Sequence, residues 1–69
     1  MTVKQLMKVT DNDTFLRFVE DRRVIKEIMS YELKGSPYAV DIALMKRDVK
    51  RVRAKAEGIF QITLKSIEN

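Results

Sequence analysis

The most regular alternation of apolar and polar residues in the chain lies near its C-terminal end. Phe60, Ile62 and Leu64 alternate with polar residues in a run rich in β-branched types, which predicts a strand with one apolar face. A lone strand needs a neighbour that satisfies its backbone, so the residues before it are its natural partner in a hairpin. The alternation therefore predicts a sheet at this end of the chain, with a turn at Glu57 and Gly58.

Residues 47–57 fit two structures. As a strand, they place apolar residues on one face and Arg51, Arg53 and Lys55 on the other. As a helix, they continue from residue 37 with apolar residues spaced by three or four positions and stop at a glycine. The first structure gives a basic strand, and the second gives a long basic amphipathic helix.

The N-terminal part of the chain predicts one helix and one strand. Thr2, followed three residues later by Gln5, has the form of a capping box, and apolar residues recur behind it at helical spacing. We therefore expect a helix over roughly residues 3 to 9. Residues 14–20 are rich in aromatic and β-branched types and carry no helical stripe, which predicts a strand.

Residues 24–33 fit a strand or a helix, and we favour the strand. As a strand they would pair with residues 14–20 through a turn at residues 21–23. As a helix, their apolar stripe would end at the glycine that follows. A further helix is expected to begin at Ser36 and Pro37, because serine caps helices and proline fits the first helical position.

The composition limits both the core and the chemistry. The 69 residues make one small α+β domain over residues 1–69, close to the size at which packing alone gives marginal stability. The chain has no cysteine and no histidine, which excludes a disulfide framework, a thiolate metal site and a triad built on imidazole. No apolar run approaches the roughly 20 residues that span a bilayer, and the N-terminus lacks the apolar core of a signal peptide. We therefore expect a cytoplasmic protein that binds no membrane.

Positive charge is concentrated in one stretch. The net charge of the chain is +4, whereas residues 46–55 alone carry +5. Their cations are Lys46, Arg47, Lys50, Arg51, Arg53 and Lys55, against the single acid Asp48. Such a cluster attracts anions, whether a nucleic-acid backbone, a nucleotide or an acidic protein surface. The alternative is a solvated polar face that only keeps the protein in solution.

The sequence carries no catalytic or phosphate-binding motif. Its two glycines stand in no phosphate loop or dinucleotide pattern, so we expect a protein that is not an enzyme and has neither cofactor nor metal. Arginine forks match pairs of phosphate oxygens, and aromatic rings stack on bases. The candidate ligand-binding residues are therefore Arg47, Lys50, Arg51, Arg53, Lys55, Lys65, Tyr31 and Tyr38.

Short segments spread over most of the chain carry a resemblance. They are Thr2-Val3-Lys4-Gln5-Leu6, Asp13-Thr14, Tyr31 to Gly35, Asp48-Val49 and Gly58-Ile59-Phe60-Gln61-Ile62. Their order resembles that in small α+β accessory proteins of phages and prophages of Gram-positive bacteria, although Arg22 and Arg23 depart from the usual Gly- and Asp-rich turn. The resemblance implies a small antiparallel sheet in the order α-β-β-α-β-β, with helices packed on one face, and it favours the hairpin for residues 49–65.

Two functions follow as hypotheses. Phage accessory proteins of this size sequester nucleotide signals or occupy a defence nuclease, so the resemblance implies a counter-defence protein in the host cytoplasm. We expect a sponge-like binder of an anionic nucleotide or nucleic acid, assembled as a homo-oligomer because so small a sheet leaves apolar surface to cover. The alternative is an inhibitor that docks on a host defence enzyme, such as a CRISPR nuclease. A DNA-binding regulator would require the long helix over residues 37–57.

Overall fold

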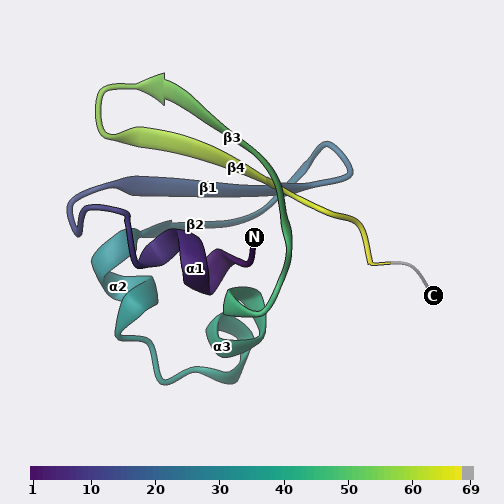
Figure 1. Cartoon of the computed structure of the whole chain (residues 1–69), viewed down its shortest axis with the longest axis horizontal. Helices are drawn as coiled ribbons and strands as arrows, with labels where there is room; N and C mark the ends of the chain where they lie inside the picture. Colours follow the sequence, from purple (N-terminus) through teal and green to yellow (C-terminus); the bar gives the residue numbers. More distant parts are fainter. Residues whose placement is uncertain (68–69) are drawn as a thin grey trace.

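Four strands form one mixed sheet in the computed structural model, which describes residues 1–67 (Figure 1). They are β1 (Phe15–Glu20), β2 (Arg23–Met29), β3 (Val49–Ala56) and β4 (Ile59–Leu64), in the spatial order β2-β1-β4-β3. Each half of the sheet is an antiparallel hairpin, but the central strands β1 and β4 run parallel. The predicted antiparallel sheet is therefore wrong at its centre, because the connection after β2 brings β4 in beside β1 with the same direction.

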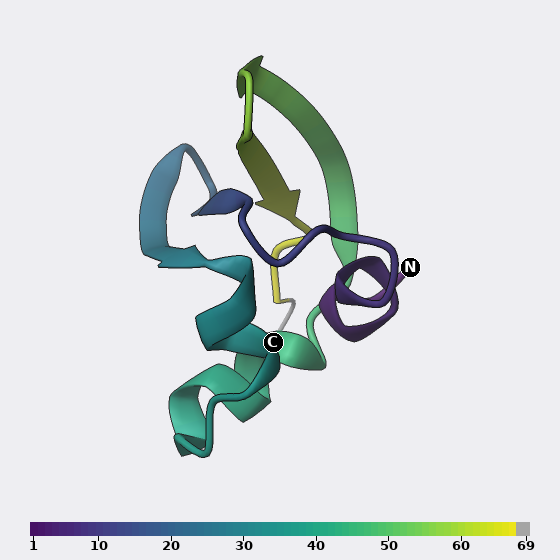
Figure 2. The same ribbon diagram turned by 90° about the vertical axis from the view of Figure 1, so that its left-hand side faces the viewer.

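Three short helices lie on one side of this sheet. They are α1 (Val3–Met7), α2 (Ser30–Lys34) and α3 (Ala39–Met45), and Figure 2 shows the sheet curving over them. The order is therefore α-β-β-α-α-β-β, with one helix more than predicted. In the part of the chain that the structure describes, no helix is both long enough and apolar enough to cross a membrane.

The additional helix arises inside residues 24–33, which combine both expected structures. They form a strand to Met29 and a helix from Ser30. Ser30 is fully buried, its backbone N–H donates to the carbonyl of Thr14 at 2.8 Å, and its hydroxyl donates to the carbonyl of Asp11. These bonds anchor the start of the helix to the loop before β1.

The first helix begins as predicted. The Thr2 hydroxyl accepts from the N–H of Gln5 at 3.2 Å, and the Gln5 side chain accepts from the N–H of Thr2 at 2.8 Å. These two bonds form the capping box and satisfy N–H groups that lack partners inside the helix. The helix ends at Met7, slightly earlier than the sequence indicates.

Helix α3 begins later than the sequence indicates, and it takes the shorter of its two sequence-based forms. Its N-cap is Tyr38, two residues beyond the predicted cap, because the hydroxyl of Ser36 is bonded to Asp41 inside the helix. The helix stops at Met45, and residues 49–56 are a strand. The long helix over residues 37–57 is therefore wrong, and the DNA-binding regulator that depended on it is not supported.

The core lies between the helices and the two central strands. Alternation along β1 places Leu16 and Phe18 on the same face, and both are buried. The buried cluster consists of Val3, Met7, Leu16, Phe18, Leu33, Leu44, Ile62 and Leu64. All three helices and both central strands contribute to it, so the opposite face of the sheet takes little part in the core.

The two hairpins turn by different means. The β3–β4 hairpin turns at Glu57 and Gly58, as predicted, and Gly58 has a φ of 73°. The β1–β2 hairpin turns at Asp21 and Arg22, whose φ values are 50° and 67°. Left-handed φ at both central residues is typical of a two-residue hairpin turn, but residues with a side chain adopt it at a cost.

Candidate anion-binding surface

The face of the sheet that points away from the helices carries three arginines in neighbouring strands. In the β3–β4 ladder, Arg51 lies opposite Thr63 and Arg53 lies opposite Gln61. In the parallel pair, Gln61 lies opposite Arg17 of β1. We call these five residues the basic face. The sequence pattern predicted that Arg51 and Arg53 share a face, whereas their partners on β4 and the addition of Arg17 depend on the register of the sheet.

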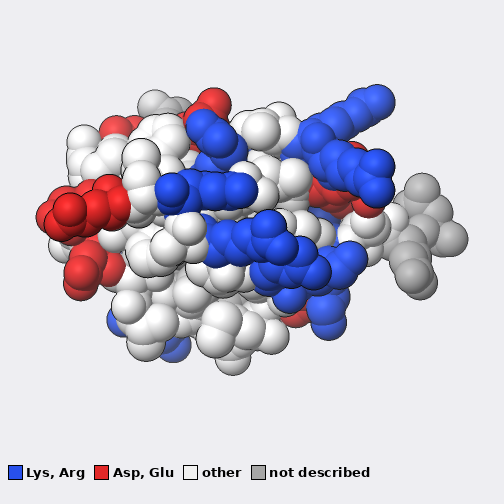
Figure 3. Space-filling view, turned by 90° about the horizontal axis from the view of Figure 1, so that it is seen from above, with Lys and Arg blue, Asp and Glu red and all other residues white. Residues whose placement is uncertain are grey.

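The surrounding surface is also rich in cations. Figure 3 looks onto the sheet from the side away from the helices and shows Lys and Arg side chains in a band across its centre, with a group of acidic side chains at the left edge. Because Leu16 and Phe18 are buried on the helix side, Arg17 between them faces outward. This face of the sheet therefore carries a group of positively charged side chains.

The three arginines of the basic face differ in their partners. Arg17 pairs with Glu27 of β2, with 3.3 Å between Nε and Oε2. Arg51 and Arg53 are exposed and have no acidic partner among residues 1–67. An exposed guanidinium without an acid keeps its donors for a phosphate or carboxylate from another molecule.

Arg47, which the sequence suggested as a ligand-binding residue, is committed to an internal ion pair. Its guanidinium donates to the carboxylate of Glu20 at 2.7 Å and to the carbonyl of Lys65 at 2.8 Å. The hydrogen bond from Arg47 holds the pKa of Glu20 below its ordinary value, despite the opposing effect of desolvation. Arg47 therefore ties the end of β1 to the segment after β4, and its charge is largely neutralised.

The other lysines of the predicted set are exposed but do not share one position. Lys50 and Lys55 stand on β3 where the register of the β3–β4 ladder shifts, so the ladder assigns neither to a face. Lys65 lies one residue beyond β4, and its N–H donates to the carbonyl of Asp48 at 3.0 Å. These lysines add positive charge near the basic face but are not part of it.

The two tyrosines lie apart from the basic face. Tyr31 stands in the first turn of α2 and Tyr38 is the N-cap of α3, and both are exposed. Both helices lie below the sheet in Figure 1, whereas Arg51 and Arg53 face the other way. The structure therefore does not bring together the stacking rings and arginine forks that the sequence suggested as one site.

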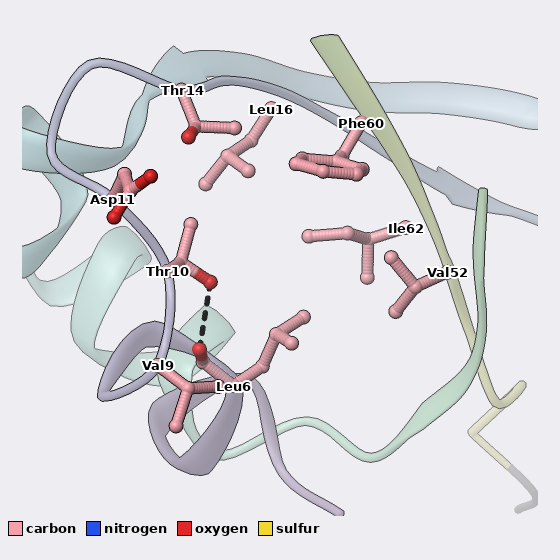
Figure 4. Close-up of a pocket in the computed structure, with 9 residues that line it drawn as sticks. All are labelled: Leu6, Val9, Thr10, Asp11, Thr14, Leu16, Val52, Phe60 and Ile62. Carbon is pink, nitrogen blue, oxygen red and sulfur yellow. Dashed lines mark hydrogen bonds between the residues drawn. The ribbon is translucent and has the colours of Figure 1, made fainter. Parts of the chain in front are cut away.

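A cavity of about 250 Å³, which no pattern in the sequence predicted, lies on the helix side of the sheet (Figure 4). Its walls are mostly apolar: Leu6 and Val9 on one side, and Val52, Phe60 and Ile62 on the other. Thr10, Asp11 and Thr14 lie at one end, where the Thr10 hydroxyl donates to the carbonyl of Leu6 at 2.7 Å. Leu6 and Val9 are three positions apart, so the sequence alone indicates that they face the same side. Only the tertiary structure shows that they lie opposite β3.

A buried carboxylate lies between α3 and β2. Asp41 is 3% exposed, its Oδ2 accepts from the Ser36 hydroxyl at 2.5 Å, and its Oδ1 lies 3.2 Å from Nζ of Lys26. The Ser36 hydrogen bond and the Lys26 charge lower the pKa of Asp41, although burial acts in the opposite direction. Among residues 1–67 no cluster of acidic side chains is arranged to hold a metal ion. The ion pair between Asp41 and Lys26 links α3 to β2.

No family model matches the chain, and no curated protein or solved structure matches it either. The resemblance to phage accessory proteins therefore stays a prediction from the sequence.

Proposed function

We propose that this protein is a non-enzymatic binding protein whose basic face engages an extended anionic partner. The observation that carries the proposal is the pair Arg51 and Arg53, which lie on one face of an exposed strand without an acidic partner among residues 1–67. Nearby, Arg47 is neutralised by Glu20. Arg51 and Arg53, in contrast to Arg47, thus keep donors that no acid among residues 1–67 occupies.

The shape of the surface favours an extended partner over a compact nucleotide. Small ligands are usually held in concave sites that bury most of their surface. Arg51 and Arg53 line none of the five cavities described among residues 1–67. An exposed strand with arginines at alternate positions is better suited to charges that are repeated along a chain, as in a nucleic acid or an acidic protein segment.

The state of the acidic residues supports a role without catalysis. A general acid or base works best when its pKa lies near the operating pH. Glu20 and Asp41 each have a pKa lowered by the groups that bind them, so both stay charged at neutral pH. Their ion pairs hold parts of the fold together.

The biological setting of the proposal comes from the sequence resemblance. We propose a phage-type counter-defence role in the cytoplasm, in which nucleic acid or an acidic surface of a host defence enzyme supplies the negative charge. A homo-oligomer remains part of this proposal. Antiparallel pairing of β3 with β3 of a second copy, centred on Val52, would set Arg51 opposite Arg53, and directly opposed like charges destabilise a sheet. We therefore place any contact between copies elsewhere.

Binding of a labelled single-stranded oligonucleotide and a labelled poly-glutamate peptide tests the proposal by fluorescence anisotropy at several salt concentrations. We expect salt-dependent binding that weakens by about tenfold in the double variant Arg51→Ala and Arg53→Ala, with a salt slope flatter by roughly one to two units. The matched control is Arg22→Ala with Arg23→Ala, which removes the same charge at the β1–β2 turn. Equal losses in both double variants, or no binding of either probe, would contradict the proposal.

A further inference from the structure

β3 is an edge strand whose beginning is already paired by the N-terminal residues. The N–H of Val49 donates to the carbonyl of Met1 at 2.7 Å, and Thr2 forms an antiparallel bridge with Asp48. Beyond this bridge, no strand among the described residues lies along the outer edge of residues 50–56. An edge of this kind presents backbone N–H and C=O groups that another strand is able to pair with.

The apolar cavity adjoins this open edge. Val52 is its wall on β3, and Val9 stands on the opposite side of the cavity in Figure 4. The two side chains are 41% and 78% exposed, so the cavity is open to solvent between α1 and the edge. Directly paired residues of neighbouring strands have Cβ atoms about 5 Å apart. An apolar side chain opposite Val52 on an added strand would therefore lie at the mouth of the cavity.

The charges on the other face of β3 specify the neighbours of that apolar side chain. Val52 pairs with buried Ile62 on the helix side, whereas Arg51 and Arg53 belong to the outer face. In an added strand, the residues before and after the apolar one would lie opposite these arginines. Acidic side chains at both positions would complement them, since carboxylates are natural partners of guanidinium groups. The edge thus matches the pattern acidic, apolar, acidic.

We propose that the β3 edge binds an extended segment of a partner protein by strand addition, with an apolar side chain in the cavity and acidic side chains on Arg51 and Arg53. This inference rests on the proposed function and names the anionic partner of the same site. Main-chain hydrogen bonds supply affinity in such complexes, and pockets for alternate side chains supply specificity. A nucleic acid offers charge, but it has no peptide backbone to continue the sheet.

Two labelled peptides of identical composition test the proposal. In one, glutamates alternate with leucine and valine; in the other, the glutamates and the apolar residues form separate blocks. We expect the alternating peptide to bind about tenfold more tightly than the block peptide and more tightly than a single-stranded oligonucleotide of equal charge. We also expect it to slow amide hydrogen exchange in residues 50–56, because edge N–H groups gain partners.

Variants of the cavity separate the apolar contact from the charge contact. Val52→Phe fills the cavity mouth without a change of charge. We expect it to weaken binding of the alternating peptide by about tenfold and binding of the oligonucleotide by less than about twofold. Val9→Asn is a second variant on the opposite wall, where the exposed side chain has little effect on folding. Its matched control is Val40→Asn on α3, another exposed valine that lines a different cavity.

The outcomes distinguish the two proposals. If both peptides bind equally through Arg51 and Arg53 and exchange in residues 50–56 is unchanged, strand addition is wrong and the basic face remains an anion-binding surface. Tighter binding of the oligonucleotide than of either peptide also overturns strand addition, because nucleic acid is then the better partner. If no probe binds, or binding does not depend on the two arginines, the proposed function fails and the inference fails with it.

Discussion

The two hairpins are halves of one sheet, yet they use their charged side chains in opposite ways. On the β1–β2 hairpin, Arg17 pairs with Glu27, Lys26 pairs with buried Asp41, and Glu20 takes up Arg47. On the β3–β4 hairpin, the arginines of the basic face have no acid among residues 1–67. The three ion pairs of the first hairpin stabilise this fold, whereas Arg51 and Arg53 of the second are available to another molecule.

The two hairpins also differ in what stabilises their turns. The β1–β2 turn places Asp21 and Arg22 at left-handed φ, and Asp21 is held by a hydrogen bond from the hydroxyl of Ser66. The β3–β4 turn places Gly58 at left-handed φ, which glycine adopts without a steric cost. The first hairpin thus depends on contacts with the rest of the molecule, and the second depends on its own local sequence.

The largest effect on stability is expected at the buried carboxylate beside the first hairpin. Asp41→Asn keeps the shape of the side chain but removes the charge that Lys26 faces and weakens the bond from Ser36. We expect the free energy of unfolding to fall by about 2 kcal/mol, as measured by urea denaturation. The control is Asp13→Asn in an exposed loop, with an expected change below about 0.5 kcal/mol. Equal effects of the two substitutions would show that the ion pair adds no stability.

Acid should weaken the protein through the same carboxylate. The pKa of Asp41 lies below its ordinary value of 3.8, so its stabilising contribution is complete above that value and is lost as the pH falls through the lower folded pKa. We expect the free energy of unfolding to decrease below about pH 4, with a shallower decrease in Asp41→Asn. The pKa of Glu20 is also lowered, so part of the decrease should persist in the variant. If the free energy of unfolding falls equally with decreasing pH in both proteins, the role of Asp41 is contradicted.

The sequence predicted the elements whose pattern is local. Alternation over residues 60–65 and the aromatic, β-branched run at residues 14–20 predicted two strands, and Gly58 predicted the second turn. The break at Ser30 could not be predicted, because it depends on bonds to Asp11 and Thr14 in a distant loop. The parallel pairing of β1 and β4 has no local signal either, since it joins strands from different hairpins.

Some features of the candidate site could likewise be predicted from local sequence, and others could not. The shared face of Arg51 and Arg53 follows from strand periodicity, so the sequence alone indicated it. The neutralisation of Arg47 could not be predicted, because its partner Glu20 is 27 residues away in the chain. The positions of Tyr31 and Tyr38 below the sheet likewise depend on how α2 and α3 pack. Periodicity identifies residues that share a face, but only the tertiary structure shows which charges remain unpaired.

A smaller effect is expected from the turn of the second hairpin. Gly58→Ala forces a side chain into left-handed φ, and no other atom lies near enough to resist it, so the cost is that of the backbone alone. We expect a loss of about 1 kcal/mol in the free energy of unfolding. Arg22→Gly should act in the opposite direction, with a gain below about 1 kcal/mol because glycine also makes the unfolded chain more flexible. A loss in Arg22→Gly would mean that its side chain contributes to the first hairpin.

The smallest effect on stability is expected from Arg51 and Arg53, the two arginines of the basic face without an acidic partner among residues 1–67. Arg51→Ala with Arg53→Ala removes exposed side chains that have no acidic partner among residues 1–67, so the free energy of unfolding should change by less than about 0.5 kcal/mol. Arg47→Ala is the matched comparison from the same stretch, and the loss of its bonds to Glu20 and Lys65 should lower the free energy of unfolding by more than the double variant does. Urea denaturation of both variants measures the difference. If the double variant is the less stable of the two, the arginines hold the hairpin together, and their exposure would no longer indicate a surface kept free for a partner.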